Sequence, residues 1–423
     1  MSQQLPPLDE DVTRRLREIR SADLLVGIPS FNNERTIGHV VRAVVSGIAK
    51  HFPDAKAVLV NSDGGSRDRT REIVERTEPG NLTEILVDAA PKPTDRIVTP
   101  YTGLPGKGSA LRTIFRIAGE LEAKACCVVD SDLRSITPGW IEVLMSPVLR
   151  HGYEFVSPLY SRHRYDGTIT NTIVYPLTRA LYGKRIRQPI GGDFGFSGAL
   201  AARFLEYDRW EGPVARYGID IFMTSTALAE GRRCCQAFLG AKLHDPKDPG
   251  ADLQPMMVEV VSTLFELMER YETVWEGISS SEDVPLFGFS HAVGLDPVPV
   301  KVERLAAIFR QAAGDLPPVW ESFLSPGSIA AIRDAAAAPA PALADEAWAR
   351  ILFEAAAGWR ARNLPRETLI LSLVPLYLGK VATFVAETRD GTDDEAEERL
   401  GALAAVFERE KNVLRDLWRA GAR

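Results

Sequence analysis

The feature that most constrains the fold is an alternation of short apolar runs with amphipathic helical patterns over about the first third of the chain. Asp23–Ile28 is an apolar run of strand length, and after a turn at Pro29–Asn33 a helical pattern runs from Thr36 to about Ala49. The same alternation predicts further strands at Ala57–Val60, Glu84–Val87 and Ala125–Asp130, and helices at Arg71–Arg76 and Ser109–Leu121. Strands that alternate with helices predict parallel βαβ units and a doubly wound, mostly parallel sheet. In such a sheet a ligand binds beyond the carboxyl ends of the strands.

Composition and charge exclude several classes of protein. The net charge of -7 argues against a general nucleic-acid or membrane-surface binder, because such a protein needs a basic face. The most apolar run, Leu369–Leu378, is about half the length of a membrane span, so we expect a buried helix there. The N-terminus has no signal-peptide pattern, and Cys126–Cys127 and Cys234–Cys235 lie in strand-like runs where buried free thiols are expected. These features predict a cytoplasmic protein in a reducing compartment.

The character of the sequence changes after about residue 252. Residues 1–22 read as an N-terminal helix, and residues 23–252 carry the α/β pattern and all the motifs described below. From Met256–Tyr271 onward nearly everything has helical periodicity, with a loop at Ala335–Ala344 and a charged amphipathic helix at Asp393–Trp418. Residues 253–423 are therefore expected to form a helical C-terminal region, with packing, dimerisation or a lid over a second substrate all open as its role.

Acidic residues follow one of the predicted strands directly. Asp130-Ser131-Asp132 comes at the end of an apolar run, where carboxylates suit a divalent cation that neutralises a diphosphate. A strand-ending turn with a helix cap explains the same three residues equally well. A second ligand is then needed from a distant segment, and His244 lies at another strand-to-loop junction. A lone histidine is more often structural than a ligand, so it gains weight only through its partners.

Two glycine-containing segments offer groups for a substrate. Pro105-Gly106-Lys107-Gly108 opens a helix, where glycines let the backbone approach an anion and Lys107 adds positive charge. Gly191-Gly192-Asp193 places a carboxylate beside a glycine pair, which suits a wall pressed against a sugar. Tyr217-Gly218-Ile219-Asp220 supplies another acid at a probable helix start. Either aspartate can instead act as a helix or turn cap.

Taken in order, these motifs resemble the GT-A glycosyltransferases that make glucosyl-3-phosphoglycerate and mannosyl-3-phosphoglycerate, and they resemble mannosylglycerate synthase. The segment Pro29–Glu34 looks like the family's PxxNEE opening, and Asn61–Ser66 looks like its base-and-ribose strip. The PGKG loop is the same, Asp130–Asp132 matches the metal-binding DxD, and Gln188–Asp193 matches QPLGGE with Asp in place of Glu. Tyr217–Asp220 matches YGxE, again with Asp for Glu, and His244 falls where the family has a metal-binding histidine.

The resemblance implies an α/β GT-A fold with a doubly wound sheet, a retaining hexosyl transfer and a homodimer. Asp132 and His244 would bind Mg²⁺ or Mn²⁺, while Lys107, Asp193 and Asp220 would carry the catalytic roles. The donor would be GDP-, UDP- or ADP-glucose, with mannose as the alternative sugar. The implied nucleotide-sugar contacts are Pro29, Ser30, Asn32, Glu34, Ser62, Asp63, Gly106, Lys107, Asp130, Ser131, Gly191, Gly192, Asp193, Tyr217 and Asp220.

The acceptor is predicted from Asp166–Thr172, where the phosphoglycerate enzymes carry an arginine for the acceptor phosphate. Here Gly167 is the shared glycine, Thr168 stands in place of that arginine, and Thr170 is the shared hydroxyl. A hydroxyl cannot neutralise a phosphate, so D-glycerate is expected and glucosylglycerate, a compatible solute, is the expected product. Arg162 and Arg164 lie just upstream and can replace the missing charge, which would favour 3-phosphoglycerate. A transferase for a lipid phosphate or a polysaccharide, or a non-catalytic nucleotide-sugar-binding protein, are the rival interpretations.

Overall fold

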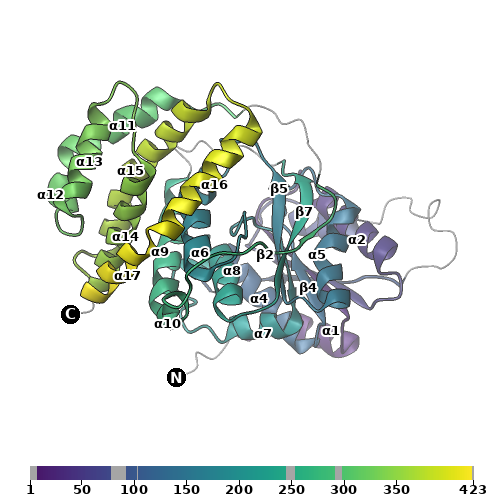
Figure 1. Cartoon of the computed structure of the whole chain (residues 1–423). Helices are drawn as coiled ribbons and strands as arrows, with labels where there is room; N and C mark the ends of the chain where they lie inside the picture. Colours follow the sequence, from purple (N-terminus) through teal and green to yellow (C-terminus); the bar gives the residue numbers. More distant parts are fainter. Residues whose placement is uncertain (1–6, 78–91, 102, 244–252, 291–297, 422–423) are drawn as a thin grey trace. The chain divides into compact units, whose positions relative to one another are not determined.

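The computed structural model of the chain describes residues 7–77, 92–101, 103–243, 253–290 and 298–421 (Figure 1). These residues pack as two compact units. The first unit comprises Met1–Ser161, Ile190–Asp245 and Val284–Gly294, and the second comprises Arg162–Pro189, Pro246–Asp283 and Leu295–Arg423. Residues 162–189 therefore pack with the helical unit, whereas the sequence division places them in the α/β domain.

The first unit is built on one eight-stranded sheet with the strand order β3-β2-β1-β4-β6-β5-β7-β8. Neighbouring strands run parallel except β6, which is antiparallel to both β4 and β5. The sheet is thus mostly parallel, as the alternation of strands and helices predicts. The strands are β1 Leu24–Ser30, β2 Ala57–Asp63, β3 Asp95–Pro100, β4 Ala125–Val128, β5 Phe155–Ser161, β6 Phe194–Ser197, β7 Cys234–Ala241 and β8 Leu286–Phe287.

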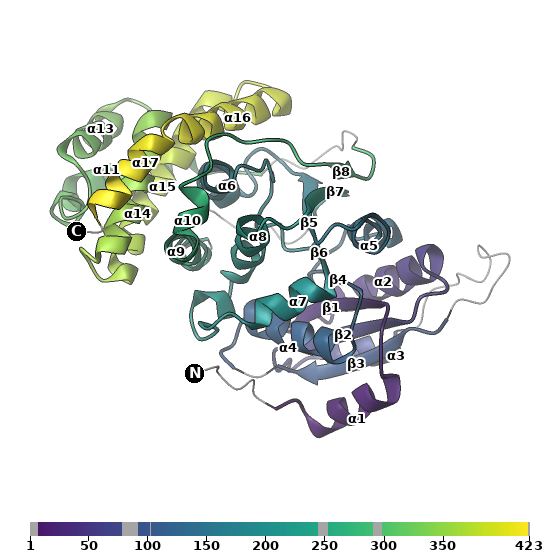
Figure 2. The same ribbon diagram turned by 60° about the horizontal axis from the view of Figure 1, so that its bottom comes forward.

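Helices cover both faces of this sheet, which is why β1 and β2 are buried along their whole length (Figure 2). On one face, the apolar stripes of α2 and α5 pack on β1, β2 and β4. On the other, Ile114 of α4 lies so close to β1 that a Cβ on Gly27 would meet it at 2.6 Å. Phe115 and Phe196 are in edge-to-face contact on that side, with centroids 5.4 Å apart. The helices of this unit are α1 Glu10–Ile19, α2 Ile37–His51, α3 Thr70–Arg76, α4 Lys107–Glu120, α5 Pro138–His151, α7 Gly198–Leu205 and α8 Ile219–Ala229, with a 3₁₀ turn at Pro213–Ala215.

The described part of the second unit is almost entirely helical. Its long apolar helix, α15 Arg366–Thr388, has the length and composition of a membrane span, but 83% of its most apolar window is buried inside the protein. This agrees with the buried helix expected at Leu369–Leu378. The helices are a π-helical turn at Thr170–Val174, α6 Tyr175–Tyr182, α9 Gln254–Arg270, α10 Glu272–Trp275, α11 Val302–Asp315, α12 Pro317–Trp320, α13 Pro326–Ala337, α14 Asp345–Ala361, α15, α16 Asp393–Arg409 and α17 Lys411–Ala420.

Most predicted elements are found with small shifts at their ends. The strands predicted at Asp23–Ile28 and Ala57–Val60 correspond to β1 and β2, which run on to Ser30 and Asp63. The strand predicted at Glu84–Val87 lies outside the described residues. The tail at Asp393–Trp418 is two helices, α16 and α17, separated at Glu410. All four cysteines are buried and free, as expected.

Candidate active site

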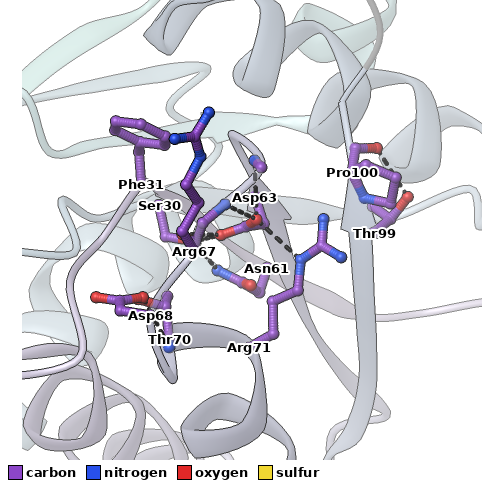
Figure 3. Close-up of polar contacts among 12 residues, drawn as sticks. Ser30, Phe31, Asn61, Asp63, Arg67, Asp68, Thr70, Arg71, Thr99 and Pro100 are labelled. Carbon is purple, nitrogen blue, oxygen red and sulfur yellow. Dashed lines mark hydrogen bonds and ion pairs between the residues drawn. The ribbon is translucent and has the colours of Figure 1, made fainter.

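The carboxyl ends of β1 and β2 bring their polar residues together. The two strands are in parallel register, so Ser30 lies opposite Asp63, and the Ser30 hydroxyl donates to the Asp63 carboxylate at 3.0 Å (Figure 3). Asn61 on β2 donates to Ser30 Oγ at 2.9 Å and to the backbone of Ile28 at 3.0 Å. Of the residues predicted to contact the nucleotide, Ser30, Ser62 and Asp63 thus lie at one edge of the sheet, and all three are buried.

Asp63 holds the turn that follows β2. Its carboxylate accepts from the backbone N–H of Gly65 at 2.9 Å, from Ser66 through both N–H and hydroxyl, and from Arg71 Nε at 2.9 Å (Figure 3). Burial opposes ionisation of this group, but these donors outweigh that penalty and lower its pKa. A carboxylate with this many internal donors fixes the shape of the segment Asn61–Ser66, which we call the nucleotide strip after its predicted role.

The loop after β1 is tied to the loop after β2. The Asn32 N–H donates to Ser66 Oγ at 2.8 Å, and Asn32 Oδ1 accepts from the Arg67 N–H at 2.9 Å. Glu34 pairs in the same way with Asp68 and Arg69. Asn32 and Glu34, both predicted as donor contacts, therefore shape the loop through these bonds. Phe31, which the sequence analysis did not single out, presents a ring that is 59% exposed above this edge.

The PGKG glycines are required for packing within the protein. A Cβ on Gly106 would lie 2.5 Å from the Ala215 carbonyl oxygen, and a Cβ on Gly108 would lie 1.8 Å from that of Val214. The start of α4 therefore presses against the 3₁₀ turn. The sequence predicts instead that these glycines let the backbone come close to an anion. In the structure they are needed because the backbone of the 3₁₀ turn lies against them. The close packing nevertheless places Lys107 at the head of α4, with its ammonium directed at the strand ends.

Lys107 links three segments that the sequence analysis treated separately. Its Nζ lies 2.7 Å from Asp130 Oδ1 and 3.2 Å from Asp220 Oδ1, and it donates to the Gly192 carbonyl at 3.1 Å. The side chain of Lys107 is 17% exposed. Asp220 Oδ1 is buried and, despite this ion pair, has no well-directed hydrogen bond among the described residues.

A second lysine, Lys242, lies on the other side of Asp130. Its Nζ donates at 2.8 Å to Asp130 Oδ2, to Asp193 Oδ2 and to the Gly191 carbonyl. The sequence motifs do not single out Lys242, because the residue that matches the family pattern is His244, two positions later. The available signal was a lysine placed directly after β7, where the carboxyl ends of the sheet strands meet.

Asp193 is fully buried at the centre of this group. Its Oδ1 accepts from the Asp130 backbone N–H at 2.7 Å, and its Oδ2 accepts from the Tyr160 hydroxyl as well as from Lys242. Four of the predicted site residues, Lys107, Asp130, Asp193 and Asp220, are therefore brought together with a second lysine, Lys242. We call Lys107, Asp130, Asp193, Asp220 and Lys242 the five-residue cluster.

The pKa values of two carboxylates in the cluster, Asp130 and Asp220, are shifted in opposite directions. Burial would raise the pKa of Asp130, but the ammonium groups of Lys107 and Lys242 outweigh it and lower that pKa strongly. Burial raises the pKa of Asp220, and Lys107 offsets this only in part. Burial likewise opposes the charged form of Lys107, yet the surrounding carboxylates raise its pKa. The charged forms of Asp130 and Lys107 are thus favoured by their neighbours, whereas burial disfavours the charged form of Asp220.

The two carboxylates of the DSD motif differ in their fitness for a divalent cation. Both oxygens of Asp130 are held by lysines, so this side chain does not fit a metal ligand. Asp132 is exposed, and an exposed carboxylate at the end of a strand is suited to bind a divalent cation. His244 lies outside the described residues, and among the described residues no three His, Cys, Asp or Glu side chains gather as a metal site.

The predicted acceptor residues lie in the second unit. Thr168 is 1% exposed, and its hydroxyl is 2.5 Å from the hydroxyl of Tyr377. Thr170 is also buried. Arg164 donates to the Gly391 carbonyl and lies 3.6 Å from Asp393. A Cβ on Gly167 would lie 3.4 Å from Arg162 Nη1, so Arg162 does fold back onto this loop.

The sequence is similar to those of known glycosyltransferases. Residues 25–207 match the family described as glycosyl transferase family 2. A glucosyl-3-phosphoglycerate synthase of Petrotoga mobilis is 24% identical over 274 residues, which cover 61% of this chain and 77% of that protein.

Solved structures of the corresponding Mycobacterium tuberculosis enzyme are also similar. The complex with Mn²⁺, uridine diphosphate and phosphoglyceric acid is 22% identical, with a TM-score of 0.44 over 63% of this chain and 84% of that chain. The complex with Mg²⁺ and uridine diphosphate is 22% identical, with a TM-score of 0.43 over 62% and 84% of the two chains. Residues 25–207 thus match the model of glycosyl transferase family 2, and the chain is distantly similar in sequence to a glucosyl-3-phosphoglycerate synthase.

Proposed function

We propose that this glycosyltransferase moves glucose from a nucleoside diphosphate sugar to 3-phosphoglycerate, with retention of configuration at the anomeric carbon. The observation that carries the donor half of this proposal is the five-residue cluster. It gathers a partly exposed ammonium and a buried, incompletely partnered carboxylate at the carboxyl ends of the strands, beside the nucleotide strip on β1 and β2. This is where a doubly wound sheet binds its ligand.

The chain's own groups have distinct tasks in this proposal. Lys107, at the head of α4, stabilises the negative charge that grows on the diphosphate as the sugar leaves. Asp220 Oδ1, which has no well-directed hydrogen bond among the described residues, accepts a hydrogen bond from a sugar hydroxyl and so orients the ring. A divalent cation held at the two predicted ligands, Asp132 and His244, would supply further charge neutralisation of the diphosphate.

The acceptor assignment changes from the one that the sequence favours. The sequence favours D-glycerate because Thr168 replaces an arginine, which requires that the Thr168 hydroxyl is available to a ligand. That hydroxyl is buried against Tyr377, so it no longer supports glycerate. Arg162 lies over Gly167, 3.7 Å from the Asp166 carboxylate, and places a cation at the same loop. Together with the name of the Petrotoga mobilis relative, this favours the phosphorylated acceptor.

The test is a matrix of donors and acceptors with analysis of the products. UDP-, GDP- and ADP-glucose and GDP-mannose are each incubated with 3-phosphoglycerate, D-glycerate and lactate in the presence of Mg²⁺ or Mn²⁺. We expect the highest kcat/KM with a glucose donor and 3-phosphoglycerate, and an α-linked product by NMR. A higher kcat/KM with D-glycerate contradicts the acceptor assignment, and an absence of transfer to any three-carbon acid contradicts the proposed function.

Lys107→Met tests the donor half separately. Loss of a charge-assisted contact costs about 1.5–3 kcal/mol, so nucleoside diphosphate binding or turnover should fall about 10- to 100-fold. The matched control is Lys124→Met, because Lys124 is 68% exposed and pairs only with Asp23 among the interactions the structure describes. An unchanged steady-state profile of Lys107→Met contradicts the assigned role.

A further inference from the structure

We propose that Lys242 is a positioning residue, which fixes Asp130, Asp193 and the Gly191 carbonyl in the geometry that the transfer reaction needs without contacting the substrate. The proposal rests on the function proposed above. It adds a residue to which neither the sequence motifs nor the comparisons assign a role.

The first argument is that the Lys242 ammonium has no donor left for a ligand. An ammonium carries three N–H bonds, and here three acceptors lie at 2.8 Å from Nζ: Asp130 Oδ2, Asp193 Oδ2 and the Gly191 carbonyl oxygen. The side chain is 5% exposed. A phosphate can reach this ammonium only if one of these bonds breaks.

The second argument is the span that Lys242 bridges. Asp130 follows β4 and Lys242 follows β7, and the strands β6 and β5 lie between them. At about 4.8 Å per strand spacing, the two strands are about 14 Å apart across the sheet. The loops must converge for the pair to form, and the long lysine stem closes the remaining distance. Lys242 thus ties the far half of the sheet to the strand that carries the DSD motif.

Tyr160 completes the environment of this ammonium. The Tyr160 ring centroid lies 5.2 Å from Lys242 Nζ, and its hydroxyl donates to the same Asp193 oxygen that Lys242 contacts. The ring packs on Trp140, with centroids 5.5 Å apart, and is itself buried. Asp193 is therefore held from two sides by side chains that come from β5 and from the end of β7.

Lys107 shows the contrast between a substrate-facing and a positioning lysine. Its side chain is 17% exposed, and its contact with Asp220 at 3.2 Å is not a well-directed hydrogen bond. Lys107 therefore has more freedom than Lys242 to turn toward a phosphate. Lys242 is less exposed and has three short hydrogen bonds, so the same movement would leave buried carboxylates without their counter-ion.

The experiment compares Lys242→Met, Lys242→Arg, Tyr160→Phe and Lys107→Met in the full-length enzyme. Calorimetry measures the Kd of UDP, and steady-state kinetics measure kcat and KM for UDP-glucose. Lys242→Met is expected to lower kcat at least about 100-fold with a change of less than about 3-fold in the Kd of UDP. Tyr160→Phe, which leaves the charge of the cluster intact, should lower kcat about 10-fold with an equally small change in Kd. Lys107→Met should instead weaken UDP binding.

Lys242→Arg separates geometry from charge. A planar guanidinium cannot direct three donors to the acceptors that surround one compact ammonium, so kcat should stay at least about 10-fold low. Recovery of kcat in this variant would show that a positive charge is sufficient and would overturn the positioning role. So would a loss of UDP affinity in Lys242→Met as large as that in Lys107→Met.

Two further readouts keep the test independent of folding problems and of the acceptor. If Lys242→Met does not fold, Tyr160→Phe and Lys242→Arg carry the comparison. Hydrolysis of the donor in water needs no acceptor, so a wrong acceptor assignment does not affect the result. Hydrogen–deuterium exchange of the peptide containing Gly191 needs no turnover, and it should rise in Lys242→Met. Unchanged exchange there contradicts the inference even if the protein is not a transferase.

Discussion

Gly192 offers the sharpest test of the five-residue cluster, because the space above it is already filled. Its φ is +94°, and a Cβ added to it would lie 2.4 Å from Asp130 Oδ2 and 2.8 Å from Lys242 Nζ. Gly192→Ala must therefore displace at least one of the two atoms that form the ion pair. Gly231→Ala is the matched control, because Gly231 has a φ of +66° and no atom within 4 Å of the added Cβ.

The two substitutions share one cost and differ in another. A left-handed conformation costs a non-glycine residue about 1–2 kcal/mol, and this cost applies to both variants. Disruption of a buried, hydrogen-bonded ion pair costs about 3–5 kcal/mol, and this cost applies only to Gly192→Ala. The expected loss of local stability is thus about 4–7 kcal/mol for Gly192→Ala and about 1–2 kcal/mol for Gly231→Ala.

Native-state hydrogen–deuterium exchange of the peptides that contain β4 and β6 is the appropriate assay. The described residues pack as two units, so a single unfolding free energy is not well defined for the chain. Tryptophan fluorescence would report mainly on the second unit, which holds Trp275, Trp320, Trp348, Trp359 and Trp418 out of seven tryptophans in all. Equal protection of β4 and β6 in the two variants would refute the reasoning, because the ion pair would then contribute nothing to holding these strands.

Three other predictions concern separate parts of the molecule. Phe31→Ala removes an exposed side chain whose ring can stack on a base, and such stacking is worth about 1–3 kcal/mol. Calorimetry should therefore show about 5- to 150-fold weaker binding of UDP but unchanged binding of pyrophosphate. Equal losses of affinity for both ligands contradict the stacking role. Asp132→Ala should lower turnover at least about 100-fold and remove its dependence on added Mn²⁺. Equal activity of the wild type and the variant in the presence of a chelator contradicts the role of Asp132 as a metal ligand. Burial lowers the pKa of Lys411 to about 7, although it donates to the Ile278 carbonyl at 2.8 Å. Between about pH 7 and pH 10 the unfolded chain therefore holds a proton that the folded chain has released. The Tm of the wild type should thus rise relative to that of Lys411→Met as pH increases across this range. A difference in Tm that does not depend on pH contradicts the lowered pKa of Lys411.

The parallel half of the sheet could be predicted because its strands are buried on both faces. β1, β2 and β4 read as continuous apolar runs and are separated by helical patterns, which is the signature of such strands. The polar residues that follow them were placed at one edge by the same topology, and Asp63 and Asp130 are found there. What could not be predicted is how these carboxylates are used. Nothing local in the sequence shows that Asp63 is held by internal donors or that Asp130 is held by two lysines.

The long-range partners escaped prediction for a physical reason. Lys242 lies 112 positions after Asp130, and their contact depends on how the loops after β4 and β7 converge. Periodicity reports which face of an element is buried, but it carries no information about such a convergence. The same limit applies to Thr168, where the pairing with Tyr377 spans 209 positions. Substitution of an arginine by this threonine looks like a change in ligand chemistry, whereas the structure uses the hydroxyl for packing within the second unit.

The two aspartates that replace glutamate in the family motifs now have different consequences. Asp193 is fully buried and its two oxygens already accept from Asp130, Tyr160 and Lys242, so its short side chain fits an internal role. Asp220 keeps one buried oxygen without a directed hydrogen bond, and its pKa is raised by burial because Lys107 compensates it only in part. A buried polar oxygen in that condition is costly unless a ligand completes its bonding. Of the two acids, Asp220 is therefore the one expected to meet the sugar. A glutamate at this position would reach one methylene farther, so Asp220→Glu should alter the choice between glucose and mannose donors more than Asp193→Glu, which should instead disrupt the cluster and lower activity with both donors.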